Sequence, residues 1–223
     1  MTLADIRTEF LDWLNRSDCT TARATTIIQR AQARIQREVR VPAMESSISA
    51  SADSNGNLSF ITIPGDFLEA QRIIADGKAL QMTTPEHLLD ETNTSVPLLT
   101  GASTNGSVPY GTPLLQGGPE FAARVQGQYN LWPYPQSYAT LYYYGSFGAL
   151  VADTDTNTLL TFSPDVLRYA ALSYAGDFFR MDERSDWETR YQAEKEALRL
   201  LGQDADMGGG PMTVTSAYDG GYL

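Results

Sequence analysis

Residues 158–201, TLLTFSPDVLRYAALSYAGDFFRMDERSDWETRYQAEKEALRLL, decide the fold because they contain the two clearest helix signals in the chain. Ser163-Pro164-Asp165 supplies an N-cap, a proline at the first helical position and an early acid, which predicts a helix from Pro164 to about Met181. Apolar residues lie nearly all around this helix, so its own domain or neighbouring subunits must cover it. A capping box over 185–188 predicts a second helix that ends near Gly202, with the buried stripe Trp187, Tyr191, Glu194, Leu198 and Leu201.

Two more helices are predicted at the N-terminus. Thr2 can cap a helix from Leu3 to about Asn15, and a second helix runs from about Thr21 to Val39, before Pro42. One face of the second helix is apolar. On another face four arginines fall within roughly 60° of one another at 100° per residue: Arg23, Arg30, Arg34 and Arg37. This basic ridge is either a solvated helix face or a surface that faces DNA or an acidic partner.

The middle of the chain has the period-two pattern of β-strands. Residues 47–51 and 58–62 alternate around the turn residues Ser54-Asn55-Gly56-Asn57, which predicts a β-hairpin. Further strands are predicted at 70–76, 78–82, 121–125, 128–132 and 138–147, and these complete a small antiparallel sheet with the hairpin. The stretch 92–118 is rich in Gly, Ser, Thr, Asn and Pro, which predicts a long exposed loop.

These patterns predict an α+β fold, in which an antiparallel bundle of about four helices carries an inserted small antiparallel β domain. The bundle is discontinuous, from 1–43 and 158–203, and the β-rich insertion covers 44–157. Residues 204–223 form an extended C-terminal tail in which apolar anchors are separated by Gly, Ser, Thr and Asp. The tail either frays or becomes ordered along another subunit, through Met212, Val214, Tyr218, Tyr222 and Leu223.

Charge and composition exclude several classes of protein. The 223 residues carry a formal net charge of −11, which argues against a freestanding nucleic-acid binder. Residues 1–41 hold seven Arg and five acids, a balance of +2, so the rest of the chain carries −13. Cys19 is the only cysteine, so no intramolecular disulfide can form. Without an apolar run of membrane-spanning length or a signal-peptide pattern, we expect a soluble protein made in the cytoplasm.

The sequence offers little for catalysis, and we expect no catalytic residue, metal or cofactor. His87 is the only histidine, so the usual nucleophilic relays and zinc sites cannot be assembled. Residues 153–157, DTDTN, lack the sixth-position Gly and twelfth-position acid of a calcium loop, so a polar linker is favoured. An enzyme would have to use paired carboxylates for glycan hydrolysis, from among Asp66, Glu69, Asp165 and Asp177.

The order of these elements resembles the head-to-tail adaptor, or connector, proteins of tailed bacteriophages. The resemblance covers roughly residues 1–202. It rests on the order of the elements and on the general character of short segments, with no invariant catalytic signature. After the N-terminal helix pair it is carried by IPGDFLEAQR at 63–72, GKAL at 77–80, YYY at 142–144, LL at 159–160, SPDVLRYAAL at 163–172 and Trp187-x-x-x-Tyr191.

The resemblance implies a structural virion protein and not an enzyme. In that family a helical bundle carries a β insertion, and copies form a ring, commonly a dodecamer, between the portal protein and the tail or nozzle proteins. It further implies that C-terminal tails reach the portal and that DNA passes through the ring. The expected location is the head–tail interface of the virion, after synthesis in the host cytoplasm. A tail-tube or baseplate subunit and a tail-associated glycan hydrolase are the alternatives.

Overall fold

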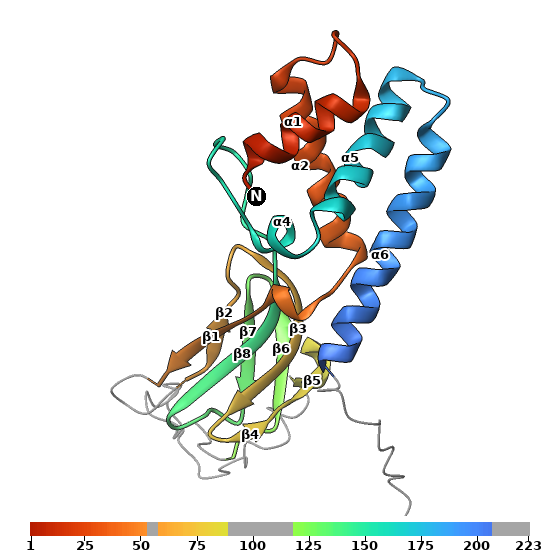
Figure 1. Ribbon diagram of the computed structural model, residues 1–223. Coiled ribbons are helices and arrows are strands. Elements are labelled where there is room, and N and C mark those ends of the chain that lie inside the picture. The colour runs from red at the N-terminus through yellow and green to blue at the C-terminus, as the bar shows by residue number, and fades with distance from the viewer. Residues whose placement is uncertain (53–57, 89–117, 207–223) are drawn as a thin grey trace, which may run out of the picture. The chain divides into compact units, whose positions relative to one another are not determined.

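The computed structural model describes residues 1–52, 58–88 and 118–206 (Figure 1). It confirms the α+β class. The chain divides into two compact units, one formed by Met1–Met44 with Phe147–Leu223 and the other by Glu45–Ser146. Residues 147–157 belong to the helical unit, whereas the predicted boundary assigns them to the β-rich insertion.

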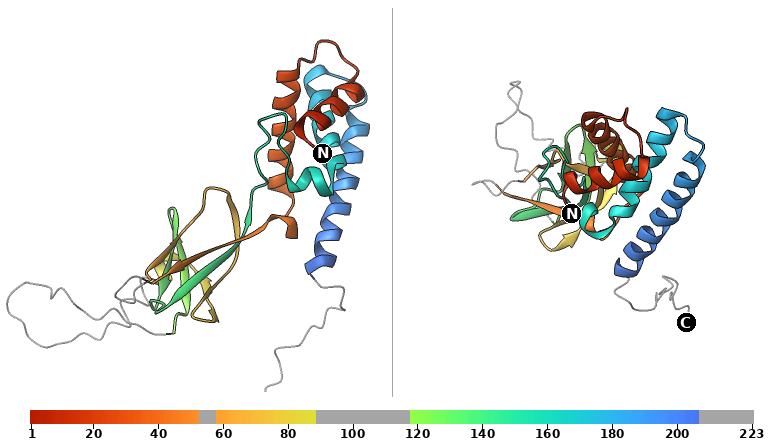
Figure 2. Two further views of the ribbon diagram at one scale, coloured as in Figure 1. Left: turned by 60° about the vertical axis from the view of Figure 1, so that its left-hand side comes forward. Right: turned by 45° about the horizontal axis from the view of Figure 1, so that its top comes forward.

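The helical unit is organised around one central helix. Its elements are α1 (Leu3–Leu14), α2 (Thr21–Glu38), the 3-10 turn η1 (Pro42–Met44), α4 (Thr158–Phe162), α5 (Pro164–Phe179) and α6 (Arg184–Asp206). Helices α1, α2 and α6 all pack against α5. The views in Figures 1 and 2 show α5 lying between α2 and α6.

Helix α5 is buried around most of its circumference by its own unit. Its buried residues are Val166, Leu167, Tyr169, Ala170, Ala171, Leu172, Ser173, Ala175 and Gly176. Of the two ways to cover this helix, the structure therefore shows the first, in which α1, α2 and α6 cover it without a neighbouring subunit. Only near its C-terminal end does α5 expose a large apolar side chain, Phe178, which is 59% exposed.

The predicted helix starts are partly confirmed. Thr2 and Asp5 form a capping box on α1, and the Thr20 side chain caps α2. Pro164 occupies the first turn of α5 as predicted, but the Ser163 side chain makes no capping hydrogen bond. The predicted capping box over 185–188 is wrong, because α6 already begins at Arg184 and the carboxylate of Glu188 is bound by Arg34.

The segment before α4 is held to the helices by polar contacts. Glutamine amides of α2 donate to its backbone carbonyls, from Gln29 to Leu150 and from Gln32 to Gly148. Asp155 accepts hydrogen bonds from the backbone N–H groups of residues 151 and 152, and Asp153 forms an ion pair with Arg7. These acids are thus engaged in fixing the segment onto the helical unit.

The β unit consists of two four-stranded sheets in the described part of the chain. One sheet has the order β1-β8-β3-β4, from Glu45–Ser51, Tyr138–Gly145, Phe67–Ala75 and Lys78–Ala79. The other has the order β2-β7-β6-β5, from Phe60–Thr62, Gln128–Trp132, Phe121–Val125 and Gln81–Thr83. Their buried side chains form a shared core that includes Ile61, Ile73, Leu131, Leu141 and Tyr143.

The predicted hairpin between residues 47–51 and 58–62 is wrong. Strand β1 pairs with β8, with Glu45 opposite Tyr144 and Ser51 opposite Tyr138, whereas β2 pairs with β7 in the other sheet. The chain therefore changes sheets between β1 and β2. The sheets are also not wholly antiparallel, because β5 runs parallel to β6.

The close approach of α5 and α6 depends on Gly176, and we expect Gly176→Ala to destabilise the helical unit. An ideal Cβ at this position would lie 2.9 Å from Cβ and 3.1 Å from Cα of Arg184. Overpacking costs about 1–3 kcal/mol, which exceeds the gain of up to about 1 kcal/mol from replacing a helical glycine. Urea unfolding followed by helical circular dichroism should show a lower midpoint.

Gly127→Ala is the matched control, because a Cβ there meets nothing within 4 Å. Its helical unfolding midpoint should equal that of the wild type. A Gly176→Ala variant as stable as this control would show that α6 can move away from α5 at little cost.

Candidate interaction surfaces

The basic ridge of α2 is divided by the structure, because Arg34 points into the helical unit. Its guanidinium donates to both carboxylate oxygens of Glu188 on α6, at 3.0 and 2.6 Å, and to Glu38 at 2.8 Å. It also lies 4.3 Å from the centre of the Tyr191 ring. The Ser173 hydroxyl on α5 donates to Glu188, so one cluster joins α2, α5 and α6.

The protonation equilibria of this cluster favour its charged form. The Arg34 hydrogen bonds lower the pKa of Glu188 to about 2, although partial burial opposes the shift. Partial burial alone raises the pKa of Glu38, but hydrogen bonds from Arg34, Lys195 and Tyr191 outweigh it and leave that pKa below its usual value. Burial and the hydrogen bond to Glu38 raise the pKa of Tyr191. The cluster is therefore a structural tie that is ionised at neutral pH.

The other ridge arginines lie outward. Arg23 is exposed, donates to the carbonyl oxygen of Asp18 and lies 5.1 Å from the centre of the Phe178 ring. Arg30 and Arg37 are exposed and have no acid or aromatic partner among the residues that the structure describes. Arg30 and Arg37 are therefore the two ridge residues most available to a partner.

Aromatic rings and arginines lie against each other near both ends of α5. Trp13 and Phe178 are 47% and 59% exposed, and the Arg16 guanidinium lies 4.7 Å from the centre of the Phe179 ring. Arg168 lies 4.9 Å from the centre of the Trp13 ring. Tryptophan and arginine are the residue types most enriched at the energetic centres of protein interfaces. The adjacent pair Phe178-Phe179, at the end of the predicted helix, is the sequence signal for the second of these places.

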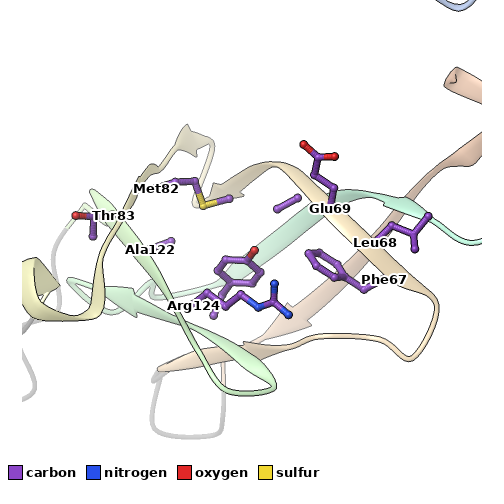
Figure 3. A pocket seen from close by; sticks show the side chains of 9 residues that line it. Phe67, Leu68, Glu69, Met82, Thr83, Ala122 and Arg124 are labelled. Carbon is purple, nitrogen blue, oxygen red and sulfur yellow. The ribbon is translucent and has the colours of Figure 1, made fainter. Parts of the chain in front are cut away.

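The β unit has one open hollow of about 370 Å³ where the two sheets part (Figure 3). Phe67, Leu68, Glu69 and Ala70 line it from β3, and Met82 and Thr83 line it from β5. Arg124 of β6 reaches across it, with its guanidinium 5.2 Å from the centre of the Phe67 ring. The hollow is of mixed polarity, with one acid, one base and the side chains of Thr83 and Tyr129 on its wall. Sequence patterns did not indicate it, because its walls come from strands of different sheets.

Of the acids considered for glycan hydrolysis, two lie on α5 and two lie in the β unit. Asp165 and Asp177 both lie on α5, roughly 18 Å apart along the helix axis at 1.5 Å per residue. Each is ion-paired, with Arg168 and Arg184 respectively. Asp66 accepts a hydrogen bond from the Tyr143 hydroxyl, and Glu69 lines the hollow of the β unit.

The described residues also bear on metal binding and on membrane-spanning helices. In the described ranges no three His, Cys, Asp or Glu side chains lie close enough to hold a metal ion. None of the helices formed by those residues has the length and apolarity needed to cross a bilayer. The tail anchors Met212, Val214, Tyr218, Tyr222 and Leu223, and nearly all of the loop 92–118, lie outside the described residues.

Comparison with known families decides the relationship. A family model described as SU10 adaptor protein matches residues 1–215. The chain belongs to the SU10 adaptor protein family. This is a phage adaptor family, so the resemblance found in the sequence is confirmed. No curated protein matches the chain.

Within this family member, the Arg34–Glu188 pair generates a prediction about pH. The lowered pKa of Glu188 contributes stability that is fully present above pH 4.5, the ordinary value, and is lost as the pH falls towards 2. Solvent screening weakens the interaction, so its contribution to the free energy of unfolding is reduced to about 1–2 kcal/mol. Glu188→Gln should therefore lower the urea midpoint at pH 7 and flatten the loss of stability between pH 5 and pH 2.

Glu194→Gln is the control, because Glu194 lies on the same helix and forms no ion pair with the described residues. Its stability should follow the wild-type pH profile. If Glu188→Gln also kept the full wild-type slope between pH 5 and pH 2, other carboxylates would control the acid lability of the helical unit.

Proposed function

We propose that this protein is the head-to-tail adaptor of a tailed bacteriophage. Copies form a ring between the portal and the tail or nozzle proteins, and DNA passes through the ring. The observation that carries the proposal is the adaptor-family match over residues 1–215 of 223. The family also implies a structural role and not an enzymatic one, and it suggests a location in the virion.

The described surfaces support a protein that contacts several partners. The helical unit exposes Trp13 and Phe178 beside arginines, and the β unit has a hollow of mixed polarity. Surfaces of this composition suit protein partners. The net charge of −11 suits DNA passage, because a largely acidic wall binds phosphates weakly and lets the strand move.

The C-terminal tail is the segment that we assign to the portal. Residues 207–223 follow α6 and carry the anchors Met212, Val214, Tyr218, Tyr222 and Leu223. An apolar residue every few positions allows an extended segment to place side chains in successive pockets of a partner. Ordering such a segment costs conformational entropy, so a large partner surface is required.

Binding to the portal tests the proposed function directly. Purified protein mixed with intact portal rings should cosediment with them, and electron microscopy of the complexes should show an added ring of density on the axis. The control is the same portal mixed with an unrelated acidic protein of similar mass. A protein that stays in the supernatant at every concentration, with intact portal rings present, would rule out the adaptor role.

The tail has its own test. Removing residues 207–223 should leave the helical circular dichroism and urea midpoint unchanged, because every helix of the folded unit ends by Asp206. The truncated protein should bind portal rings at least tenfold more weakly. Replacing Tyr218, Tyr222 and Leu223 with Ser should reproduce most of that loss. Full binding by the truncated protein would assign the portal contact to the folded units instead.

A further inference from the structure

The outer face of α2 is basic and otherwise composed of small side chains. Ala22, Thr26 and Ala33 are exposed on it, and Arg23, Arg30 and Arg37 recur along it every seven residues. Seven residues correspond to roughly 10.5 Å along the axis, so these arginines form one straight row. The only acid on α2 is Glu38, which is engaged by Arg34 and Lys195. The outer face of α2 therefore carries positively charged side chains and no carboxylate.

The outer face of α6 has the complementary character. Thr189, Ala193 and Ala197 are exposed on it, and Leu200 on the same face is 49% exposed. The acids on this face are Asp186 and Glu196. Asp186 has no basic partner in the described chain, and Glu196 is paired with Arg199 at its edge. Arg190 lies against the Tyr169 ring.

These two faces are placed on opposite sides of the helical unit. Helices α2 and α6 each pack on α5, and α5 lies between them in the views of Figures 1 and 2. The buried stripes of α2 and α6 point towards α5, so their exposed faces point away from it and from each other. When the α2 face of one copy contacts the α6 face of another, the first copy keeps a free α6 face and the second keeps a free α2 face. Further copies can therefore be added at both ends. Contacts of this head-to-tail type build rings or open chains.

We propose that the α2 face of one copy docks on the α6 face of a second copy. Small residues on both helices let the backbones approach closely, and the exposed Leu200 supplies apolar area. Arg30 and Arg37 meet Asp186 and Glu196 across the contact, which fixes the pairing of unlike faces, since two α2 faces would repel each other. This inference rests on the proposed function for the existence of a multi-copy assembly, and it names the surface that holds the copies together.

Arginine substitutions at the two exposed alanines test the contact. Ala33→Arg blocks the α2 face and Ala193→Arg blocks the α6 face, and arginine is nearly as good a helix former as alanine, so both variants should fold. In sedimentation velocity the wild type should form species larger than a dimer as concentration rises. Each variant alone should remain monomeric, because every contact needs one face of each kind.

The mixture of the two variants gives the sharpest outcome. The intact α6 face of Ala33→Arg can still bind the intact α2 face of Ala193→Arg, so an equimolar mixture should form dimers and nothing larger. Thr8→Arg, at an exposed position of α1, is the control and should assemble like the wild type. Wild-type assembly by both alanine variants, or loss of assembly in only one of them, would overturn the proposal.

Disulfide trapping detects the contact when the copies associate too weakly for sedimentation velocity. A chain carrying both Ala33→Cys and Ala193→Cys should give a ladder of cross-linked oligomers on oxidation, whereas either cysteine alone should give no dimer; Cys19 is buried. A wild type that stays monomeric, together with no ladder from the double variant, would also overturn the proposal. Portal binding without a ladder would refute this contact alone, and a ladder without portal binding would refute the adaptor role alone.

Discussion

Covering α5 on nearly every side is the constraint on which the helical unit depends. A single partner cannot cover a helix whose buried residues lie around most of its circumference. Each large apolar side chain left exposed would lose about 1.5–3 kcal/mol of stabilisation from burial. Helices α1, α2 and α6 each bring one apolar stripe to it, and Gly176 lets α6 approach closely. Ser173 on α5 is a polar exception, and it binds the Glu188 that also holds Arg34. Apolar burial thus places the helices together, and this polar cluster fixes how they face one another.

The helices were predictable because their signals are local. Thr2 and Thr20 cap the first two helices, and Pro164 begins α5, all at the positions that the sequence indicates. The predicted capping box at 185–188 failed for a reason outside the local sequence. Glu188 has a partner on α2, 154 residues away, and that contact is stronger than a bond to the start of its own helix.

The strands show where local reasoning ends. Residues 47–51 and 58–62 alternate as a hairpin would, but β1 and β2 belong to different sheets, and each strand pairs with a partner far along the chain. Strand β8 is the reason, because its Ala139, Leu141 and Tyr143 are buried in the shared core and both of its edges need partners. Period-two alternation identifies which face of a strand is buried, but it does not say which strand lies beside it.

The same limit applies to the basic ridge, and it bears on function. Arg30 and Arg34 fall on one face of α2 by periodicity, yet Arg34 is bound inside the unit and Arg30 is exposed. A row of like charges on a sequence therefore mixes residues that hold the fold with residues that meet partners, and only tertiary contacts separate them. Once Arg34 is assigned to the fold, the exposed row lies beside small residues, on the side of α5 away from the acidic face of α6. That arrangement suits contact between copies better than contact with a phosphate backbone, because the unlike charge it requires is already present on the same protein.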